Sequence, residues 1–105
     1  MIIPSDILSW LQDYFASCCN GDWEHGKGIT IETLDNPGWS VEISLQGTVL
    51  ESVAFTRIEV ETTEEDWYHC WRDGQGFHGT GGIRNLVDIL ETFRRWVEYH
   101  ASTGA

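Results

Sequence analysis

The residues best suited to covalent chemistry lie around Cys70, which has His69 beside it and His78 further along the chain. A nearby imidazolium can lower the pKa of a thiol and turn it into a nucleophile. His69 cannot do this from a regular strand, because neighbouring strand residues point to opposite faces. His78 could reach Cys70 across a turn, but Asp66 and Asp73 would raise the thiol pKa rather than lower it. The pattern therefore favours a buried structural cysteine, with a small cysteine-dependent enzyme of the sulfur-transfer kind as the alternative.

Residues 74–79 spell Gly-Gln-Gly-Phe-His-Gly, a literal G-x-G-x-x-G ahead of a predicted helix. In dinucleotide-binding proteins this pattern cradles a pyrophosphate, and an acidic residue follows about 20 positions on, after a parallel strand. Here that position falls at Tyr99, inside the last predicted helix. The negative charge of the chain also opposes phosphate. We therefore expect no cofactor, and interpret the glycines as a flexible connector or as positions of close backbone packing.

The sequence gives only weak indications of a metal site or of acid–base catalysis. The possible metal ligands contain no C-x-x-C and no H-x₃-H spacing. They are Cys18, Cys19, His25, His69, Cys70 and His78. Glu32 and Glu42 would both point to the polar face of a predicted hairpin without opposing each other. We expect no metal site and no catalytic residues.

The most distinctive polar stretch is residues 59–67, Glu-Val-Glu-Thr-Thr-Glu-Glu-Asp-Trp, which places five acids and a tryptophan around a predicted turn. Such a run is commonly a solvated loop. Carboxylates beside aromatic rings also match the charged rim and the aromatic anchors of a tight protein interface. This second interpretation, with Trp67 and Trp23 as anchors, predicts the following partner-binding residues: Glu59, Glu61, Glu64, Glu65, Asp66, Trp67, Trp23 and Glu24.

The elements that position these residues begin with a predicted hairpin over residues 28–45. Asn-Pro-Gly-Trp at 36–39 predicts a type II turn, since proline presets φ at the second position and glycine accepts positive φ at the third. Alternating apolar residues give each strand one buried face. Pairing Ile31 with Val41 stacks apolar side chains along both strands, so we expect that register.

Amphipathic helices are predicted near both ends of the chain. Ser5 would cap a helix whose apolar positions recur at helical spacing as far as Cys18, and Asn20-Gly21 would end it. A second apolar stripe begins at Ile83 and continues to Val97, which predicts a long C-terminal helix.

Two further strands are predicted between the hairpin and the last helix, over residues 53–61 and 66–73. The second has bulky residues on both faces, which suits a central strand or a surface aromatic patch. Trp67, His69 and Trp71 share one face, and the other has Tyr68, Cys70 and Arg72.

The glycine-rich residues 74–82 would form a loop, so the predicted order is one helix, four strands and one helix. Because no strand alternates with a helix, a parallel sheet is disfavoured. We expect a single α+β domain over residues 1–105, with a four-stranded mostly antiparallel sheet and both helices on one of its faces.

Composition limits the partners. The 105 residues include 17 acidic and 6 basic side chains, a formal net charge of −11. This charge repels nucleic acid and anionic lipid and favours a basic partner. The chain shows no signal peptide and no apolar run of ~20 residues, and its three cysteines form a poor disulfide framework. We expect a cytoplasmic protein that binds neither nucleic acid nor membranes.

Several short motifs between residues 23 and 96 are shared with one known family. They are Trp23-Glu24-His25, residues 28–39, Asp66-Trp67, Cys70, Phe77, Gly79, Gly81-Gly82, Asn85-Leu86, Phe93 and Trp96. With these motifs, the sequence resembles the immunity protein 53 family of bacterial polymorphic toxin systems. The resemblance implies a small cytoplasmic protein that binds and neutralises a cognate toxin domain, and it implies no catalytic residues.

Three functions remain open at this level. The first is an immunity protein that docks its acidic surface on a basic patch of a toxin; if the toxin is a nuclease, the carboxylates would stand in for substrate phosphates. The second is the small enzyme that uses Cys70. The third is a small-ligand or scaffold protein whose aromatic residues line a pocket or a dimer face.

Overall fold

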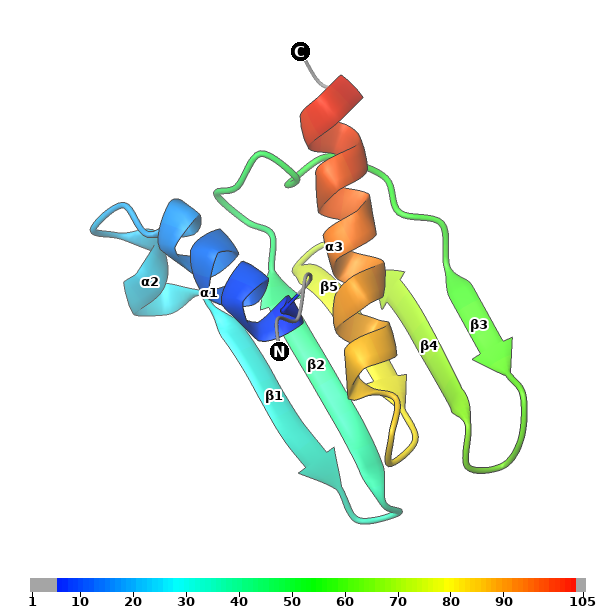
Figure 1. Cartoon of the computed structure of the whole chain (residues 1–105). Helices are drawn as coiled ribbons and strands as arrows, with labels where there is room; N and C mark the ends of the chain where they lie inside the picture. Colours follow the sequence, from blue (N-terminus) through cyan, green and yellow to red (C-terminus); the bar gives the residue numbers. More distant parts are fainter. Residues whose placement is uncertain (1–5, 104–105) are drawn as a thin grey trace.

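The computed structural model describes residues 6–103, and these form three helices and five strands (Figure 1). In chain order they are α1 (Ile7–Cys18), α2 (Trp23–Gly26), β1 (Ile29–Leu34), β2 (Gly38–Ser44), β3 (Ile58–Glu61), β4 (Trp67–Arg72), β5 (Gly76–Gly81) and α3 (Leu86–Thr103).

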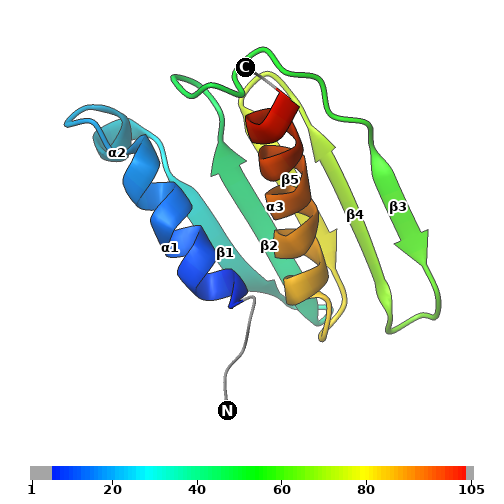
Figure 2. The ribbon, with the colours of Figure 1, turned by 45° about the horizontal axis from the view of Figure 1, so that its top comes forward.

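The strands form one antiparallel sheet in the order β1-β2-β5-β4-β3. Helices α1 and α3 lie beside each other on the same face of this sheet (Figures 1 and 2). The α+β architecture with both helices on one face is confirmed, with five strands in place of the expected four. The opposite face of the sheet, which we call the open face, is not covered by any helix of residues 6–103.

The β1–β2 hairpin has the predicted register, with Ile31 paired with Val41 and Thr30 with Glu42. The apolar residues of β2 therefore all point to the helix side of the sheet, where Val41 is fully buried. The pairing continues into β5, so this hairpin fixes which side chains of the central strand face the helices.

The predicted type II turn is wrong. That turn requires a positive φ at Gly38, and Gly38 does not have one. Gly38 instead pairs with Leu34 as the first residue of β2, so the hairpin loop consists of residues 35–37. Glycine is needed there because a Cβ would lie 2.3 Å from the carbonyl oxygen of Gly81 on β5.

The predicted loop over residues 74–82 is also wrong, because β5 occupies most of it and lies between β2 and β4 in the sheet. Glycine usually weakens a strand, but here it permits close approach of neighbouring chains. A Cβ on Gly76 would lie 2.2 Å from the carbonyl oxygen of Ile43, and one on Gly79 would lie 2.3 Å from Cγ2 of Ile89. Close packing therefore accounts for the second and third glycines of this G-x-G-x-x-G, Gly76 and Gly79.

Strand β3 is shorter than the predicted strand over residues 53–61, because residues 53–57 form no regular strand. The guanidinium of Arg72 on β4 holds the preceding segment. It donates hydrogen bonds to the carbonyl oxygens of Val53 (2.7 Å), Leu50 (3.0 Å) and Glu51 (3.0 Å). A side chain therefore replaces the strand ladder in fixing this connection.

The helix ends differ slightly from the sequence patterns. The carboxylate of Asp6 caps α1 by accepting a hydrogen bond from the backbone N–H of Leu8 at 3.0 Å. The predicted cap, Ser5, lies outside the described residues. Helix α3 begins at Leu86 rather than at Ile83, which precedes the helix and is exposed. In residues 6–103 no helix has the length and apolarity needed to cross a membrane.

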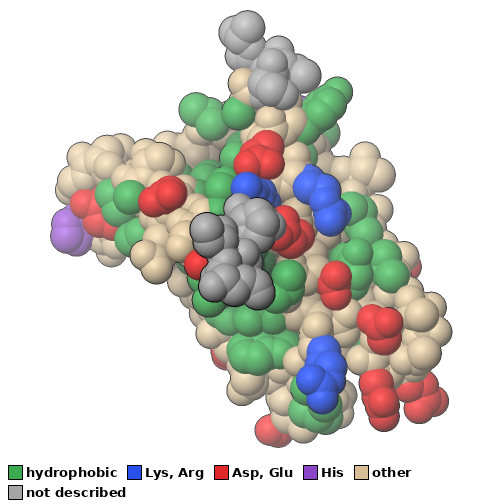
Figure 3. Space-filling view, viewed as in Figure 1, with side chains coloured by type: hydrophobic (Ala, Val, Ile, Leu, Met, Phe, Trp, Pro, Cys, Tyr) green, Lys and Arg blue, Asp and Glu red, His purple; other side chains and the backbone are tan. Residues whose placement is uncertain are grey.

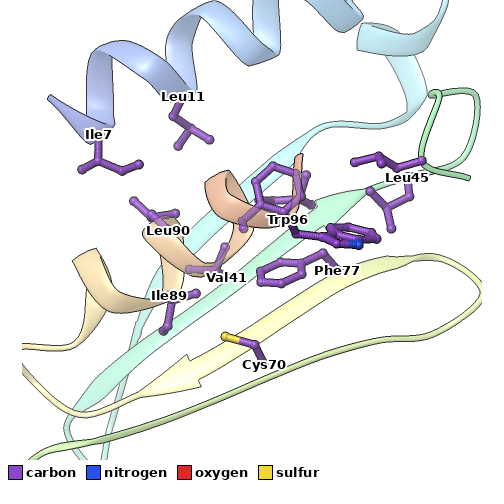
Figure 4. Close-up of a cluster of buried hydrophobic side chains, with 12 residues drawn as sticks. Ile7, Leu11, Val41, Leu45, Cys70, Phe77, Ile89, Leu90 and Trp96 are labelled. Atoms are coloured by element: carbon purple, nitrogen blue, oxygen red, sulfur yellow. The ribbon is translucent and has the colours of Figure 1, made fainter. Parts of the chain in front are cut away.

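The core lies between the helices and the sheet (Figure 4). Burial of each large apolar side chain contributes roughly 1.5–3 kcal/mol, so this layer stabilises the arrangement of the strands. Its most completely buried members are Val41, Ile43, Leu45, Cys70, Phe77, Ile89, Leu90 and Phe93.

Candidate functional site

The end of the β3–β4 hairpin carries the acidic side chains that the sequence singles out. Figure 3 shows acidic side chains gathered over this end of the molecule. The turn is ordered by its backbone, since the N–H groups of Thr62 and Thr63 donate to the carbonyl oxygen of Asp66 at 2.9 and 3.1 Å. Exposed carboxylates in and beside the turn are Glu59, Glu61, Glu64, Glu65 and Asp66. We call these five residues the acidic cluster.

Asn85, directly before α3, holds the acidic cluster against the rest of the fold. Its side-chain amide donates to Asp66 Oδ1 at 2.9 Å and to Asp88 Oδ2 at 2.8 Å. Its carbonyl oxygen accepts a hydrogen bond from the backbone N–H of Trp67 at 3.3 Å. Asn85 is only 2% exposed, so this polar side chain links the hairpin turn to the start of the helix through satisfied, buried hydrogen bonds.

Strand β4 alternates as its sequence predicts. Cys70 pairs with Gly79, whose missing side chain leaves space below Ile89 of α3, so Cys70 faces the helices. Trp67, His69 and Trp71 therefore point to the open face. All three are half-buried there by their neighbours within the sheet.

Carboxylates lie within hydrogen-bond distance of both histidines of the open face. His69 Nε2 lies 2.8 Å from Glu61 Oε2, and His78 Nε2 lies 2.9 Å from Asp73 Oδ2. The carboxylate of Asp73 also accepts hydrogen bonds from the backbone N–H groups of Gly76 and Gln75. These two bonds, followed by His78, lower the pKa of Asp73.

Arg57 and Glu59 form a charged pair on this face, with 2.5 Å between Nε and Oε2. The hydrogen bond and the positive charge of Arg57 lower the pKa of Glu59. The guanidinium of Arg57 also lies 5.0 Å from the centroid of the Trp71 ring, in cation–π geometry.

Trp23 and Glu24 are not brought together with the acidic cluster. They begin α2, which precedes edge strand β1, whereas the cluster lies beside β3 at the other edge (Figure 1). Trp23 is 4% exposed and packs against Phe15, so the expectation of a surface anchor does not hold for its ring. The carboxylate of Glu24 accepts hydrogen bonds from the backbone N–H groups of Asn20 and Gly21.

Cys70 is placed for packing rather than for chemistry. It has no exposed surface, and burial raises the pKa of its thiol to about 12. His78 pairs with Trp71 and so lies on the open face, opposite to Cys70. The possible activation of Cys70 by His78 across a turn is therefore wrong, since the sheet separates the two side chains. The acidic residue that contributes to the raised pKa is Asp88, not the predicted Asp66 or Asp73.

Residues 6–103 hold no group of three or more His, Cys, Asp or Glu side chains arranged to bind a metal ion. An open hollow of about 560 Å³ lies at one end of the sheet, and its lining includes Glu24, Lys27, Glu42 and His78.

The structure is that of a small α+β protein with one uncovered sheet face. Ordered aromatic and acidic side chains lie on that face, and the central thiol is buried. The family model described as immunity protein 53 matches residues 8–98, which is most of the chain. This protein therefore belongs to the immunity protein 53 family. No curated protein and no solved structure matches the chain.

Proposed function

We propose that this protein is a cytoplasmic immunity protein that binds and neutralises a cognate bacterial toxin domain, and that it acts by occupying the toxin rather than by catalysis. The observation that carries the proposal is the ordered acidic cluster beside Trp67 in a member of an immunity family. Carboxylates around an aromatic side chain are the elements of a tight, charge-selective interface.

Electrostatics support a basic partner surface. Arg57 offsets the charge of Glu59, but no lysine or arginine interrupts the sequence from Ile58 to Trp67, so the acidic cluster keeps a net negative charge toward a partner. The electrostatic field of its carboxylates falls off over about 8 Å at physiological salt. It has the same sign as the field of the whole chain, whose net charge is −11. Charges arranged in this way mainly accelerate association and select the partner. In a nuclease toxin, these carboxylates would occupy positions that bind substrate phosphates.

The two alternatives have less support. The thiol of Cys70 is enclosed and its pKa is raised, which is the opposite of what a nucleophile needs. The small-ligand alternative has one observation in its favour, the open hollow of about 560 Å³ beside Lys27 and His78. That hollow is open to solvent and mixes apolar residues such as Phe15 with charged ones such as Glu42, so it lacks the apolar enclosure typical of ligand pockets.

The test is co-expression with the C-terminal domain encoded by the adjacent gene, with cell survival and co-purification as readouts. We expect survival together with a stable complex. The Cys70→Ala variant should protect equally, because its thiol takes no part. Survival without a complex, or loss of protection in a folded Cys70→Ala variant, would contradict the proposal and favour an enzyme.

The role of the acidic cluster is tested separately by association kinetics. We expect Glu61→Lys with Glu64→Lys to slow association at low salt by about tenfold or more, and salt to reduce the difference. The matched control is Asp13→Lys with Asp22→Lys, which makes the same charge change at exposed positions on α1 and before α2. Equal effects of the two double variants would show that only net charge matters.

A further inference from the structure

The open face carries a row of aromatic rings that the core does not use. Because β4 pairs with β5, His78 lies beside Trp71, and the alternation of β4 adds His69 and Trp67 to the same face. The two helices lie on the other side of the sheet (Figure 2). We call Trp67, His69, Trp71 and His78 the ring row.

The ring row is ordered before any partner arrives. Trp71 and His78 stack with 5.5 Å between ring centroids and 14° between planes, and Trp67 meets His69 edge-on at 5.3 Å. Carboxylates fix both histidines from the sides, as described above for Glu61 and Asp73. Side chains that are already held lose little rotamer freedom on binding, so more of their contact energy appears as affinity.

One end of the ring row already binds a cation, and that cation comes from the chain itself. Arg57 lies over Trp71 and pairs with Glu59, so its guanidinium contacts an aromatic face and a carboxylate together. This is the arrangement in which arginine is recognised most favourably, since its planar group stacks and donates hydrogen bonds at once.

The other end of the ring row repeats the arrangement without the cation. Glu61 pairs with Trp67 across the β3–β4 ladder. Glu61, Glu64 and Trp67 surround an open hollow of about 470 Å³, together with Thr63 and His69. Among residues 6–103, arginine lies over a tryptophan ring at Trp71 and at Trp10, and none lies over Trp67.

We propose that the open face is the surface that meets the toxin domain, and that the hollow beside Trp67 receives an arginine side chain of that partner. The inference rests on the proposed function and deepens it by naming the docking face and the chemistry of the partner residue. Charge decides the occupant. A second copy of this chain would bring another net charge of −11, and nucleic acid would bring phosphates, so both oppose the carboxylates of Glu61 and Glu64.

The first experiment measures the dissociation constant for the toxin domain encoded by the adjacent gene. We expect Trp67→Ala to weaken binding by about 30-fold or more, as for a central aromatic anchor. The control truncation is Val87→Ala, a more exposed apolar side chain on α3, which should leave the constant unchanged. Circular dichroism establishes that each variant is folded.

A second pair of variants removes charge without touching a ring. Glu61→Gln with Glu64→Gln should weaken binding, whereas Asp13→Gln with Asp22→Gln, at exposed positions away from the hollow, should not. To find the partner residue, each toxin arginine is changed to glutamine, and binding of each toxin variant is measured both to the unaltered protein and to the Trp67→Ala variant. One arginine should lose its effect when the ring is absent, which is the signature of direct coupling.

The outcomes separate this inference from the function it rests on. If the unaltered protein fails to bind the toxin domain, the proposed function falls and this inference falls with it. If the unaltered protein binds but both the Trp67 and the glutamate variants bind equally well, the docking face is wrong while the immunity function stands. Coupling to no toxin arginine would overturn the arginine assignment, and a free dimer broken by Trp67→Ala would identify the occupant as a second copy.

Discussion

Replacing Gly79 by alanine tests whether close packing is the reason for glycine in the central strand. A Cβ at this position would lie 2.3 Å from Cγ2 of Ile89, whereas ordinary van der Waals contacts begin near 3.4 Å. The new methyl group thus overlaps a side chain of α3 by about 1 Å, and overpacking of a core on this scale typically costs 1–3 kcal/mol. For a domain of about this size, that corresponds to a fall in Tm of roughly 5–20 °C.

The assay is thermal and urea unfolding of a small set of variants. Gly74→Ala is the control, because nothing lies within 4 Å of a Cβ there, and it should change stability by less than about 0.5 kcal/mol. Ile89→Leu removes the methyl group that would be struck, so Gly79→Ala with Ile89→Leu should lose less stability than the two single changes added together. A harmless Gly79→Ala variant, or strict additivity, would refute the packing argument.

Two further predictions concern the connections between strands. Arg72→Met should lower stability by about 2–3 kcal/mol and speed hydrogen exchange over residues 50–57, because the carbonyl oxygens of Leu50, Glu51 and Val53 lose their donors; unchanged exchange there would contradict the role of Arg72. Asp73→Ala should lower stability at pH 7, and the loss should be smaller at pH 3. The folded state lowers the pKa of Asp73 from 3.8, so its contribution is present above that pH and disappears as acid protonates the carboxyl. Denaturant titrations at both pH values check this, and an equal loss at pH 3 would contradict it.

The hairpin register and the faces of β4 could be predicted from the sequence because alternation of apolar and polar residues is a local signal. The central strand β5 could not. Its glycines were informative only through what lies opposite to them, such as Ile89 of α3 and the carbonyl oxygen of Ile43. Those neighbours are distant in the sequence, so local composition indicates a loop where tertiary packing requires a strand.

The acidic cluster could be predicted from the sequence composition. The ring row could not, because it depends on β5, which the sequence pattern indicates as a loop. Once residues 76–81 are a strand beside β4, pairing of His78 with Trp71 follows directly. The burial of Trp23 also depends on distant contacts, since a loop tryptophan has no periodicity to assign it. Asn85 gives no signal alone, because its partners Asp66 and Trp67 come from another part of the chain.

Because helices cover only one face of the sheet, alternate residues of each strand have different surroundings. Val41 and Phe77 pack in the interior and tolerate little change, while their neighbours in the chain, Glu42 and His78, lie on the open face outside the core. Substitutions at the outward positions can therefore accumulate without unfolding the protein. Under the proposed function, changes at every second residue of β2, β5 and β4 would alter the contacts with a partner and leave the architecture the same.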